Sequence, residues 1–317
     1  KTVHVNRLQS NQKGHPSERN THLQPQISYN LITTIFPNSK LMDSYKTLEI
    51  VRKNTDSSVF HVVLNRPSQL NALSLDFFDE FPIALSSLDQ NPDVAVIILS
   101  GAGKHFCSGI DLASLSSISA QSSSGGDRGR SSEGLRRRIK SMQAAITAVE
   151  ECRKPVIAAV HGACIGGGVD LVTACDVRYC SEDAFFSIKE VDLAIVADLG
   201  TLQRLPRIVG HAKAMELALT ARRFSGCEAK ELGLVSQVFR SKSELDKGIT
   251  MIAEGIAAKS PLAVTGTKAV LLRSREMSVE QGLDYVATWN SGMLISNDLN
   301  EAVSAQMMKR QPRFSKL

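Results

Sequence analysis

The sequence predicts an α/β fold in which short buried strands alternate with helices. Three observations lead to this prediction. Apolar runs of strand length alternate with longer amphipathic stretches from about residue 46 to residue 240. Two of the apolar runs lead into glycine-rich turns that end in Gly-x-Asp-Leu, at Gly109 and at Gly168, which are 59 residues apart and hint at repeated β-β-α units. The region after residue 240 is almost entirely helical in pattern, which is typical of a part that packs on another part or another subunit.

Composition and charge indicate how many domains to expect and argue against a membrane protein or a nucleic-acid-binding protein. The chain has 317 residues, 43% of them hydrophobic, so one large domain or two are expected. No apolar run approaches the roughly 18–20 residues that cross a bilayer, so no membrane span is expected. Residues 1–41 carry five basic side chains and one acid, which leaves only +1 of the total charge of +5 for residues 42–317. Nucleic acid is therefore not an expected partner.

The first 41 residues differ from the rest of the chain. They are polar, rich in Asn, Gln, Ser and Thr, and lack sustained periodicity. We therefore expect residues 1–41 to be a disordered or non-native leader. A mitochondrial transit peptide is the alternative, which the low Arg content disfavours.

The six cysteines do not form a metal-binding pattern. No Cys-x-x-Cys pair is present, and no His lies at zinc-ligand spacing. Most of the cysteines lie in apolar runs and are interpreted as small buried hydrophobic residues in a reducing compartment. No metal site is expected.

Between residues 46 and 160, strands and helices alternate. Short apolar runs predict strands at Lys46–Val51, Val59–Asn65, Val94–Ser100 and Pro155–Val160. Ser74–Leu88 predicts an amphipathic helix that Ser74 caps and Pro82 should kink or shorten. Ser116–Ser132, rich in Ser and Gly, predicts a mobile loop that either borders a ligand site or is a surface insertion. Leu135–Cys152 predicts the next helix.

The second half of the chain is mainly helical. Helices are expected at Leu205–Leu219 and Glu228–Leu232, and a short strand at Val235–Phe239. The final helices are expected at Leu245–Ala258, Ala263–Ser274, Ser278–Met293 and Asp298–Gln306. These helices are apolar on more than one face, which favours packing against another part of the chain or another subunit.

The stretch from Pro155 to Thr201 concentrates the functional signals. A buried strand leads into a glycine turn, and a helix is expected to begin at these glycines, where free N–H groups favour negative charge. Three carboxylates follow in apolar surroundings, namely Asp170, Glu190 and Asp198. One backbone N–H from each glycine turn can converge on a single oxygen as an oxyanion hole, and carboxylates beside it can move protons on carbon next to a carbonyl. The alternative is a tight packing turn with solvated acids nearby.

The sequence does not match the common motifs for nucleotide binding or for a serine nucleophile. Gly101–Lys104 lacks the spacing of a phosphate-binding loop, with Ile98 where the first Gly belongs and His105 where Ser or Thr belongs. No Gly-x-Gly-x-x-Gly follows a first strand, and no Gly-x-Ser-x-Gly elbow is present. His161, at a strand end, is interpreted as a packed structural histidine rather than a catalytic one.

In order and spacing, several motifs resemble the crotonase (enoyl-CoA hydratase/isomerase) superfamily from about Lys46 onward. They are Leu64-Asn65-Arg66-Pro67 with Asn71-Ala72-Leu73, Phe106–Leu112, and Ile165–Asp170. The resemblance implies a crotonase-type spiral of β-β-α units over residues 42–240, which holds the catalytic site. It also implies a C-terminal helical oligomerisation region over residues 241–317 and a homotrimer or homohexamer.

Within the superfamily, the chain resembles the branch that converts 3,5-dienoyl-CoA to 2,4-dienoyl-CoA in fatty-acid β-oxidation. Gly166–Asp170, Lys189–Asp192 and Ala197–Pro206 carry this resemblance. Hydratases of the family usually have Glu at the positions of Asp170 and Glu190 and no acid at Asp198, so the chain departs from their pattern. The alternatives are an enoyl-CoA hydratase, a Δ3,Δ2-enoyl-CoA isomerase, or a non-catalytic crotonase-fold protein that binds RNA or a protein partner.

The resemblance also implies a mechanism. The thioester carbonyl would accept hydrogen bonds from the N–H groups of Ile110 and Gly167, Glu190 would remove a proton from C2, and Asp198 would deliver one at C6. Asp170 would position or electrostatically bias the other two acids. The residues implied to line the acyl-CoA path are Ser108, Gly109, Ile110, Asp111, Leu112 and Gly167. No resident cofactor is implied, because coenzyme A enters as part of the substrate.

Two further expectations follow. The two acids need opposite protonation states, so an apolar pocket built by Val191 and Leu193–Val196 should raise one pKa. Ser315-Lys316-Leu317 has the sequence of a peroxisomal address, which implies an import receptor as a partner and the peroxisome as the location.

Overall fold

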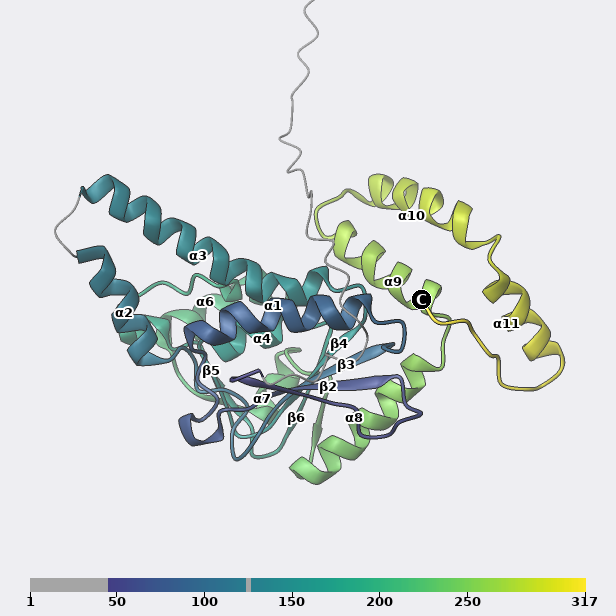
Figure 1. The fold of residues 1–317 in the computed structure, drawn as a ribbon, viewed down its shortest axis with the longest axis horizontal. Helices are drawn as coiled ribbons and strands as arrows, with labels where there is room; N and C mark the ends of the chain where they lie inside the picture. The colour runs from purple at the N-terminus through teal and green to yellow at the C-terminus, as the bar shows by residue number, and fades with distance from the viewer. Residues whose placement is uncertain (1–44, 124–126) are drawn as a thin grey trace, which may run out of the picture. The chain divides into compact units, whose positions relative to one another are not determined.

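A computed structural model of the chain describes residues 45–123 and 127–317. Figure 1 shows a twisted central sheet with helices packed on both of its faces. The predicted leader, residues 1–41, lies outside the described residues. Within the described ranges, no helix is both long enough and apolar enough to cross a membrane.

The strands form a large sheet and a small one. The large sheet has the order β1-β2-β3-β4-β6-β9, with β1 antiparallel to β2 and the other neighbours parallel. Its strands are β1 (Leu48–Val51), β2 (Val59–Leu64), β3 (Val96–Gly101), β4 (Val156–Val160), β6 (Val177–Ser181) and β9 (Gln237–Phe239). The small sheet consists of β5 (Ala163–Ile165), β7 (Phe185–Ser187) and β8 (Phe224–Ser225).

Helices cover both faces of the large sheet. Successive side chains of each strand point to opposite faces, and both sets are apolar. Ile98 of β3 packs with Ile249 on one side, whereas Ile97 and Leu99 join the larger core on the other. The helices up to the end of the spiral are α1 (Leu75–Gln90), α2 (Leu112–Ser123), α3 (Arg128–Glu151), α4 (Gly167–Ala174), α5 (Thr201–Val209), α6 (His211–Thr220) and α7 (Gly226–Glu231). The 3-10 helices are η1 (Pro67–Gln69) and η2 (Glu190–Leu193).

The last helices are α8 (Lys242–Ala257), α9 (Pro261–Ser274), α10 (Val279–Met293) and α11 (Asn297–Met307). Helix α8 packs on the large sheet, whereas α9, α10 and α11 continue beyond it (Figure 1). The predicted boundary between residues 240 and 241 therefore precedes a helix that is part of the sheet's own core. The division into two regions stays a prediction.

The repeated unit explains how the two sheets are connected. After β4 in the large sheet the chain adds β5 to the small sheet and then forms α4, and β6, β7 and η2 follow in the same way. After β3, the small sheet is represented only by a bridge between Cys107 and Cys164, and α2 follows. The predicted α/β spiral of β-β-α units is confirmed.

Several predicted elements differ from the structure. Each predicted strand is present with its ends displaced by at most two residues, but β5 to β8 were not predicted, because runs of two to five residues carry too little pattern. The single helix predicted over Leu205–Leu219 is wrong: it is two helices, separated at Gly210, whose φ of 85° helical residues do not adopt. Helix α1 continues past Pro82 to Gln90.

The mobile loop predicted over Ser116–Ser132 is also wrong. Helix α2 extends to Ser123 and α3 begins at Arg128, so most of this stretch is helical. The side chain of Asp127 caps α3 by accepting a hydrogen bond of 2.8 Å from the Arg130 N–H. This cap marks the start of α3, seven residues before Leu135, and partly offsets the weak helix propensity of Gly129, Ser131, Ser132 and Gly134.

The histidine and the cysteines that the sequence singled out can be located in the structure. His161 is buried, and its Nε2 lies 2.9 Å from the Gly103 carbonyl oxygen, in agreement with a packed structural histidine. Five of the six cysteines are buried and free, as predicted, and Cys227 is exposed.

Candidate active site

The two glycine turns lie directly against each other. A Cβ atom on Gly109 would lie 3.2 Å from the Ile165 carbonyl oxygen, and one on Gly167 would lie 3.8 Å from the Ile110 nitrogen. Gly109 has a φ of 100°, which glycine adopts without strain. The bond from Leu73 N–H to Gly109 O, at 2.8 Å, and that from Asp111 N–H to Leu73 O, at 3.0 Å, anchor the chain on either side of Ile110.

Two backbone N–H groups where the glycine turns meet have no hydrogen-bond acceptor among the described residues. Neither Ile110 N–H nor Gly167 N–H donates a hydrogen bond to another described residue. Gly167 is the first residue of α4, where an N–H has no partner within the helix. In contrast, the adjacent Gly166 N–H donates to Ser187 O at 2.9 Å. Two free donors on adjacent turns can bind one oxygen.

A cavity of about 410 Å³ opens at these two turns. Its lining contains every site residue that the sequence predicted: Ser108, Gly109, Ile110, Asp111, Leu112, Gly167, Asp170, Glu190 and Asp198. These residues come from the loop after β3 and the start of α2, from α4, and from the segment between β7 and α5 that contains η2. The structure therefore brings the predicted residues together, and their individual roles stay predictions.

Glu190, at the start of η2, faces the glycine turn. A Cβ on Gly166 would lie 3.1 Å from Glu190 Oε1, and Glu190 Oε2 is buried with no hydrogen-bond partner among the described residues. Burial first, and then the nearby carboxylates of Asp170 and Asp198, raises the pKa of Glu190 to about 7. A carboxylate with this pKa can accept and release a proton near neutral pH.

Asp170 is 1% exposed and lies on α4. Its Oδ1 accepts a hydrogen bond of 2.6 Å from the N–H of Thr201, the first residue of α5. Burial raises the pKa of Asp170 to about 6, although the hydrogen bonding with Thr201 acts in the opposite direction. Asp170 is thus tied to the start of the helix that follows Asp198.

Asp198 lines the cavity and is exposed at the surface, in the irregular segment between η2 and α5. Partial burial of its carboxyl group raises its pKa above the usual value. The main chain at this residue is held by Gln143 of α3, whose Nε2 donates to Asp198 O at 2.7 Å.

Fewer of the predicted apolar residues line the cavity around the acids than the sequence suggested. Leu193 and Ile195 line the cavity. Val191 and Val196 do not, and Val196 is 71% exposed. Helix η2 ends at Ala194, which has a left-handed φ of 57°.

Sequence reasoning missed the side chains that hold the site in place. Arg66 forms an ion pair with Asp111 at 3.2 Å and donates to Ala72 O at 2.7 Å, which ties η1 to the loop with Ile110. Arg66 and Arg204 both lie in motifs that the sequence singled out, but no pattern indicated which residues they would contact. Gln143 carried no signal at all.

Comparisons with known proteins agree with one another. The model of the enoyl-CoA hydratase/isomerase family matches residues 54–316. A protein of Arabidopsis thaliana named peroxisomal Δ(3,5)-Δ(2,4)-dienoyl-CoA isomerase is 87% identical over 276 residues, which cover 87% of this chain and 99% of that protein. The mitochondrial protein of that activity from Homo sapiens is 46% identical over 86% of this chain and 84% of its own length.

Solved structures agree as well. The crystal structure of an enoyl-CoA hydratase from Bacillus anthracis has a TM-score of 0.76 and 32% sequence identity, and the match covers 85% of this chain and 99% of that one. A second structure, of a protein from Streptomyces coelicolor described as a putative enoyl-CoA hydratase, has a TM-score of 0.78 and 26% identity over 91% of this chain and 99% of its own.

Proposed function

Because the chain belongs to the enoyl-CoA hydratase/isomerase family, we propose that it isomerises 3,5-dienoyl-CoA to 2,4-dienoyl-CoA in peroxisomal fatty-acid β-oxidation. The Arabidopsis relative carries this activity and this location in its name. One observation of the site carries the proposal: a second acid, Asp198, lines the same cavity as Glu190. A reaction that removes a proton at one carbon and adds one at a distant carbon needs two such groups.

The first part of the proposal concerns the thioester. Its carbonyl oxygen accepts hydrogen bonds from the free N–H groups of Ile110 and Gly167, which stabilise the negative charge that develops when C2 loses a proton. Removing one donor of this kind typically costs about 10²–10³ in rate. Ser108, Gly109, Asp111 and Leu112 line the path of the acyl-CoA beside them.

The second part concerns proton transfer. Glu190 takes a proton from C2, and the electron pair of that C–H bond spreads over the dienolate as far as C6. Asp198 gives a proton to C6, which leaves double bonds at C2 and C4, and the net proton count does not change. No resident cofactor takes part, since coenzyme A arrives with the substrate. Asp170 acts on this pair through position and charge.

The direct test uses purified protein and 3,5-dienoyl-CoA. The expected result is the appearance of the ultraviolet absorption band of the conjugated 2,4-dienoyl product. Rapid hydration of a 2-enoyl-CoA without diene formation would instead support the hydratase alternative. Activity on neither substrate would support a non-catalytic binding protein.

The substitution Asp198→Asn separates the proposed isomerase from a hydratase. The amide cannot supply the C6 proton, so isomerisation should fall by at least about 10²-fold, within the range for loss of a general acid. The thermal midpoint should stay close to that of the parent, since Asp198 is an exposed residue. Near-normal turnover would remove Asp198 from the mechanism.

The partners beyond the substrate are also part of the proposal. Residues Ser315, Lys316 and Leu317 recruit the peroxisomal import receptor, and the protein assembles as a homotrimer or homohexamer through the C-terminal helices. The test of the first point is a fluorescent fusion at the N-terminus, with and without Leu317. Peroxisomal fluorescence that persists without Leu317 would contradict it.

A further inference from the structure

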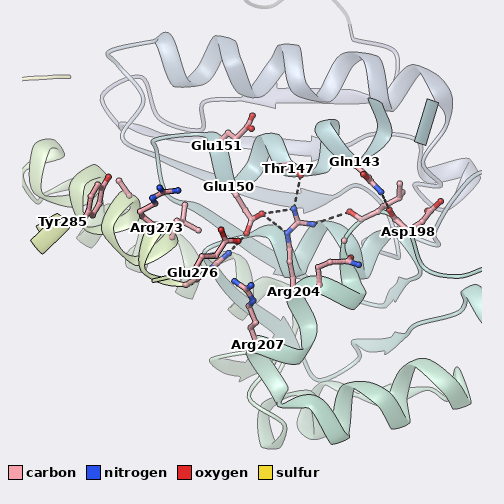
Figure 2. Close-up of a pocket in the computed structure, with 16 residues that line it drawn as sticks. Gln143, Thr147, Glu150, Glu151, Asp198, Arg204, Arg207, Arg273, Glu276 and Tyr285 are labelled. Atoms are coloured by element: carbon pink, nitrogen blue, oxygen red, sulfur yellow. Dashed lines mark hydrogen bonds and ion pairs between the residues drawn. The ribbon is translucent and has the colours of Figure 1, made fainter. Parts of the chain in front are cut away.

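A second and larger cavity, of about 900 Å³, shares Asp198 and Leu199 with the proposed substrate cavity. Figure 2 shows it between α3, α5 and α9, with Tyr285 of α10 at one end. The carboxylate of Glu150 lies at its centre and accepts a hydrogen bond of 2.8 Å from Arg204 Nε. Arg275 forms an ion pair with the other oxygen of Glu150.

Two side chains of this cavity hold the backbone that carries Asp198. Gln143 Nε2 donates to Asp198 O at 2.7 Å, and an Arg204 Nη donates to Leu199 O at 3.3 Å (Figure 2). Gly200 has a φ of 131°, and a Cβ on it would lie only 1.7 Å from the Arg204 guanidinium. The guanidinium thus lies against the Gly200 main chain, in space that any other residue would fill.

The guanidinium of Arg204 is itself fixed in orientation. Besides Glu150, it donates to Thr147 Oγ1 at 3.0 Å, and both partners belong to α3. Gln143, Thr147 and Glu150 follow one another at helical spacings of four and three residues, so they lie on one face of α3. One rigid helix face therefore holds Asp198 directly through Gln143 and holds Leu199 and Gly200 through Arg204.

We propose that Gln143 and Arg204 are positioning residues that hold the Asp198 carboxyl group where it can reach C6 of the substrate. The inference rests on the proposed function, in which Asp198 delivers that proton. Neither side chain lines the substrate cavity, so both act through the backbone of residues 198–200. This segment has no regular secondary structure of its own and needs such external support. A displacement of about 1 Å in a reacting group can cost about 10² in rate.

The test separates the two ends of the proton transfer. Gln143→Ala and Arg204→Met should lower kcat for diene formation by about 10- to 100-fold with little change in KM. In deuterated water, exchange at C2 of recovered 3,5-dienoyl-CoA should persist, because Glu190, Ile110 and Gly167 do not depend on these hydrogen bonds. The ratio of C2 exchange to isomerisation should therefore rise in both variants.

Two controls define the result. Arg207→Met removes the same charge from the same helix and cavity, but Arg207 makes no hydrogen bond to residues 198–200, so kinetics like those of the parent are expected. Arg204→Lys keeps the charge but loses the planar fork, and it should resemble Arg204→Met.

The outcomes decide between this inference and the function it rests on. If the parent protein forms no 2,4-diene, the proposed function fails. If the parent isomerises but both variants match Arg207→Met, or lose C2 exchange and isomerisation in equal measure, the positioning role is wrong. If Arg204→Met does not fold, Gln143→Ala decides alone, because it truncates a partly exposed side chain.

Discussion

Glu190 is a carboxylate held where its charge is poorly solvated. One of its oxygens is buried and has no hydrogen-bond partner in the part of the chain that the structure describes, and two further acids, Asp170 and Asp198, line the same cavity. The pKa of Glu190 rises from 4.5 to about 7 as a result. The folded protein therefore retains a proton that the unfolded chain has released over this pH range. Its stability consequently falls as pH rises through the same range.

This cost predicts the behaviour of Glu190→Gln. The amide does not ionise, so the variant should abolish isomerisation yet gain about 1–3 kcal/mol in free energy of unfolding at about pH 8. The gain should shrink markedly at about pH 5, where Glu190 in the parent is mostly protonated. Urea unfolding at both pH values measures it. A gain that is equal at both pH values, or one that the exposed Glu231→Gln reproduces, would contradict the explanation.

Asp170 shows how a residue's surroundings refine its role. The sequence placed it among the catalytic acids, and the structure adds a hydrogen bond of 2.6 Å that Asp170 Oδ1 accepts from the N–H of Thr201. A carboxylate at the start of a helix interacts favourably with the free N–H groups and the helix dipole. Asp170 therefore links α4 to α5, and through α5 to the segment of Asp198.

At the scale of elements, the turn between β4 and β5 decides where the glycine turn of the site lies. Gly162, in this turn, has a φ of 56°. A Cβ there would lie 2.2 Å from the Lys104 carbonyl oxygen. The turn therefore packs against the loop after β3, which carries the other half of the proposed oxyanion hole.

Gly162→Ala should accordingly destabilise the protein. Backbone strain alone is worth about 1–3 kcal/mol, and displacing the Lys104 carbonyl adds to it, so the free energy of unfolding should fall by at least that amount. The matched change is Gly255→Ala in α8, where a Cβ meets nothing within 4 Å. That variant should instead gain about 0.4–1 kcal/mol. Denaturant unfolding measures both, and a loss at Gly162 no larger than the effect at Gly255 would contradict the role of this turn.

At the scale of the whole molecule, the C-terminal helices carry many large apolar side chains that are exposed rather than packed in the core. Figure 1 shows α9, α10 and α11 beyond the central sheet. Large exposed apolar side chains of this region are Leu271, Val279, Leu283, Leu294, Ile295, Leu299, Val303, Met307 and Met308. Exposed apolar surface of this extent is typical of interaction sites, protein–protein interfaces among them. It supports the proposed assembly into a trimer or hexamer.

The assembly can be tested at one position. Ile295, between α10 and α11, is 84% exposed. Ile295→Asp should lower the molar mass found by light scattering, because a charge buried at an interface without a partner is costly. Met251→Asp, at a 69% exposed site on α8, should leave the mass unchanged. A monomeric parent protein would contradict the proposed assembly.

Much of this protein could be predicted from the sequence. The resemblance to the crotonase superfamily implied which individual residues line the cavity. Apolar runs located the main strands, and the glycine turns with nearby acids in apolar surroundings indicated a proton-transfer site. These signals are local, since residue type and near-neighbour spacing determine them. The short strands β5 to β8, helix α2 and the first seven residues of α3 were missed because local propensity is weak there and tertiary contacts override it.

Only the tertiary structure decided which groups support one another. Asp170 and Thr201 are 31 positions apart, Gln143 and Asp198 are 55 apart, and Arg204 and Glu150 are 54 apart. No sequence pattern spans such separations, because these contacts form only when the spiral brings α3, α4 and α5 together. The raised pKa of Glu190 has the same origin, since burial and neighbouring charge are properties of the folded cavity. The sequence thus determined which chemical groups are present. The packing of the helices determined the pKa values of these groups and where their side chains are held.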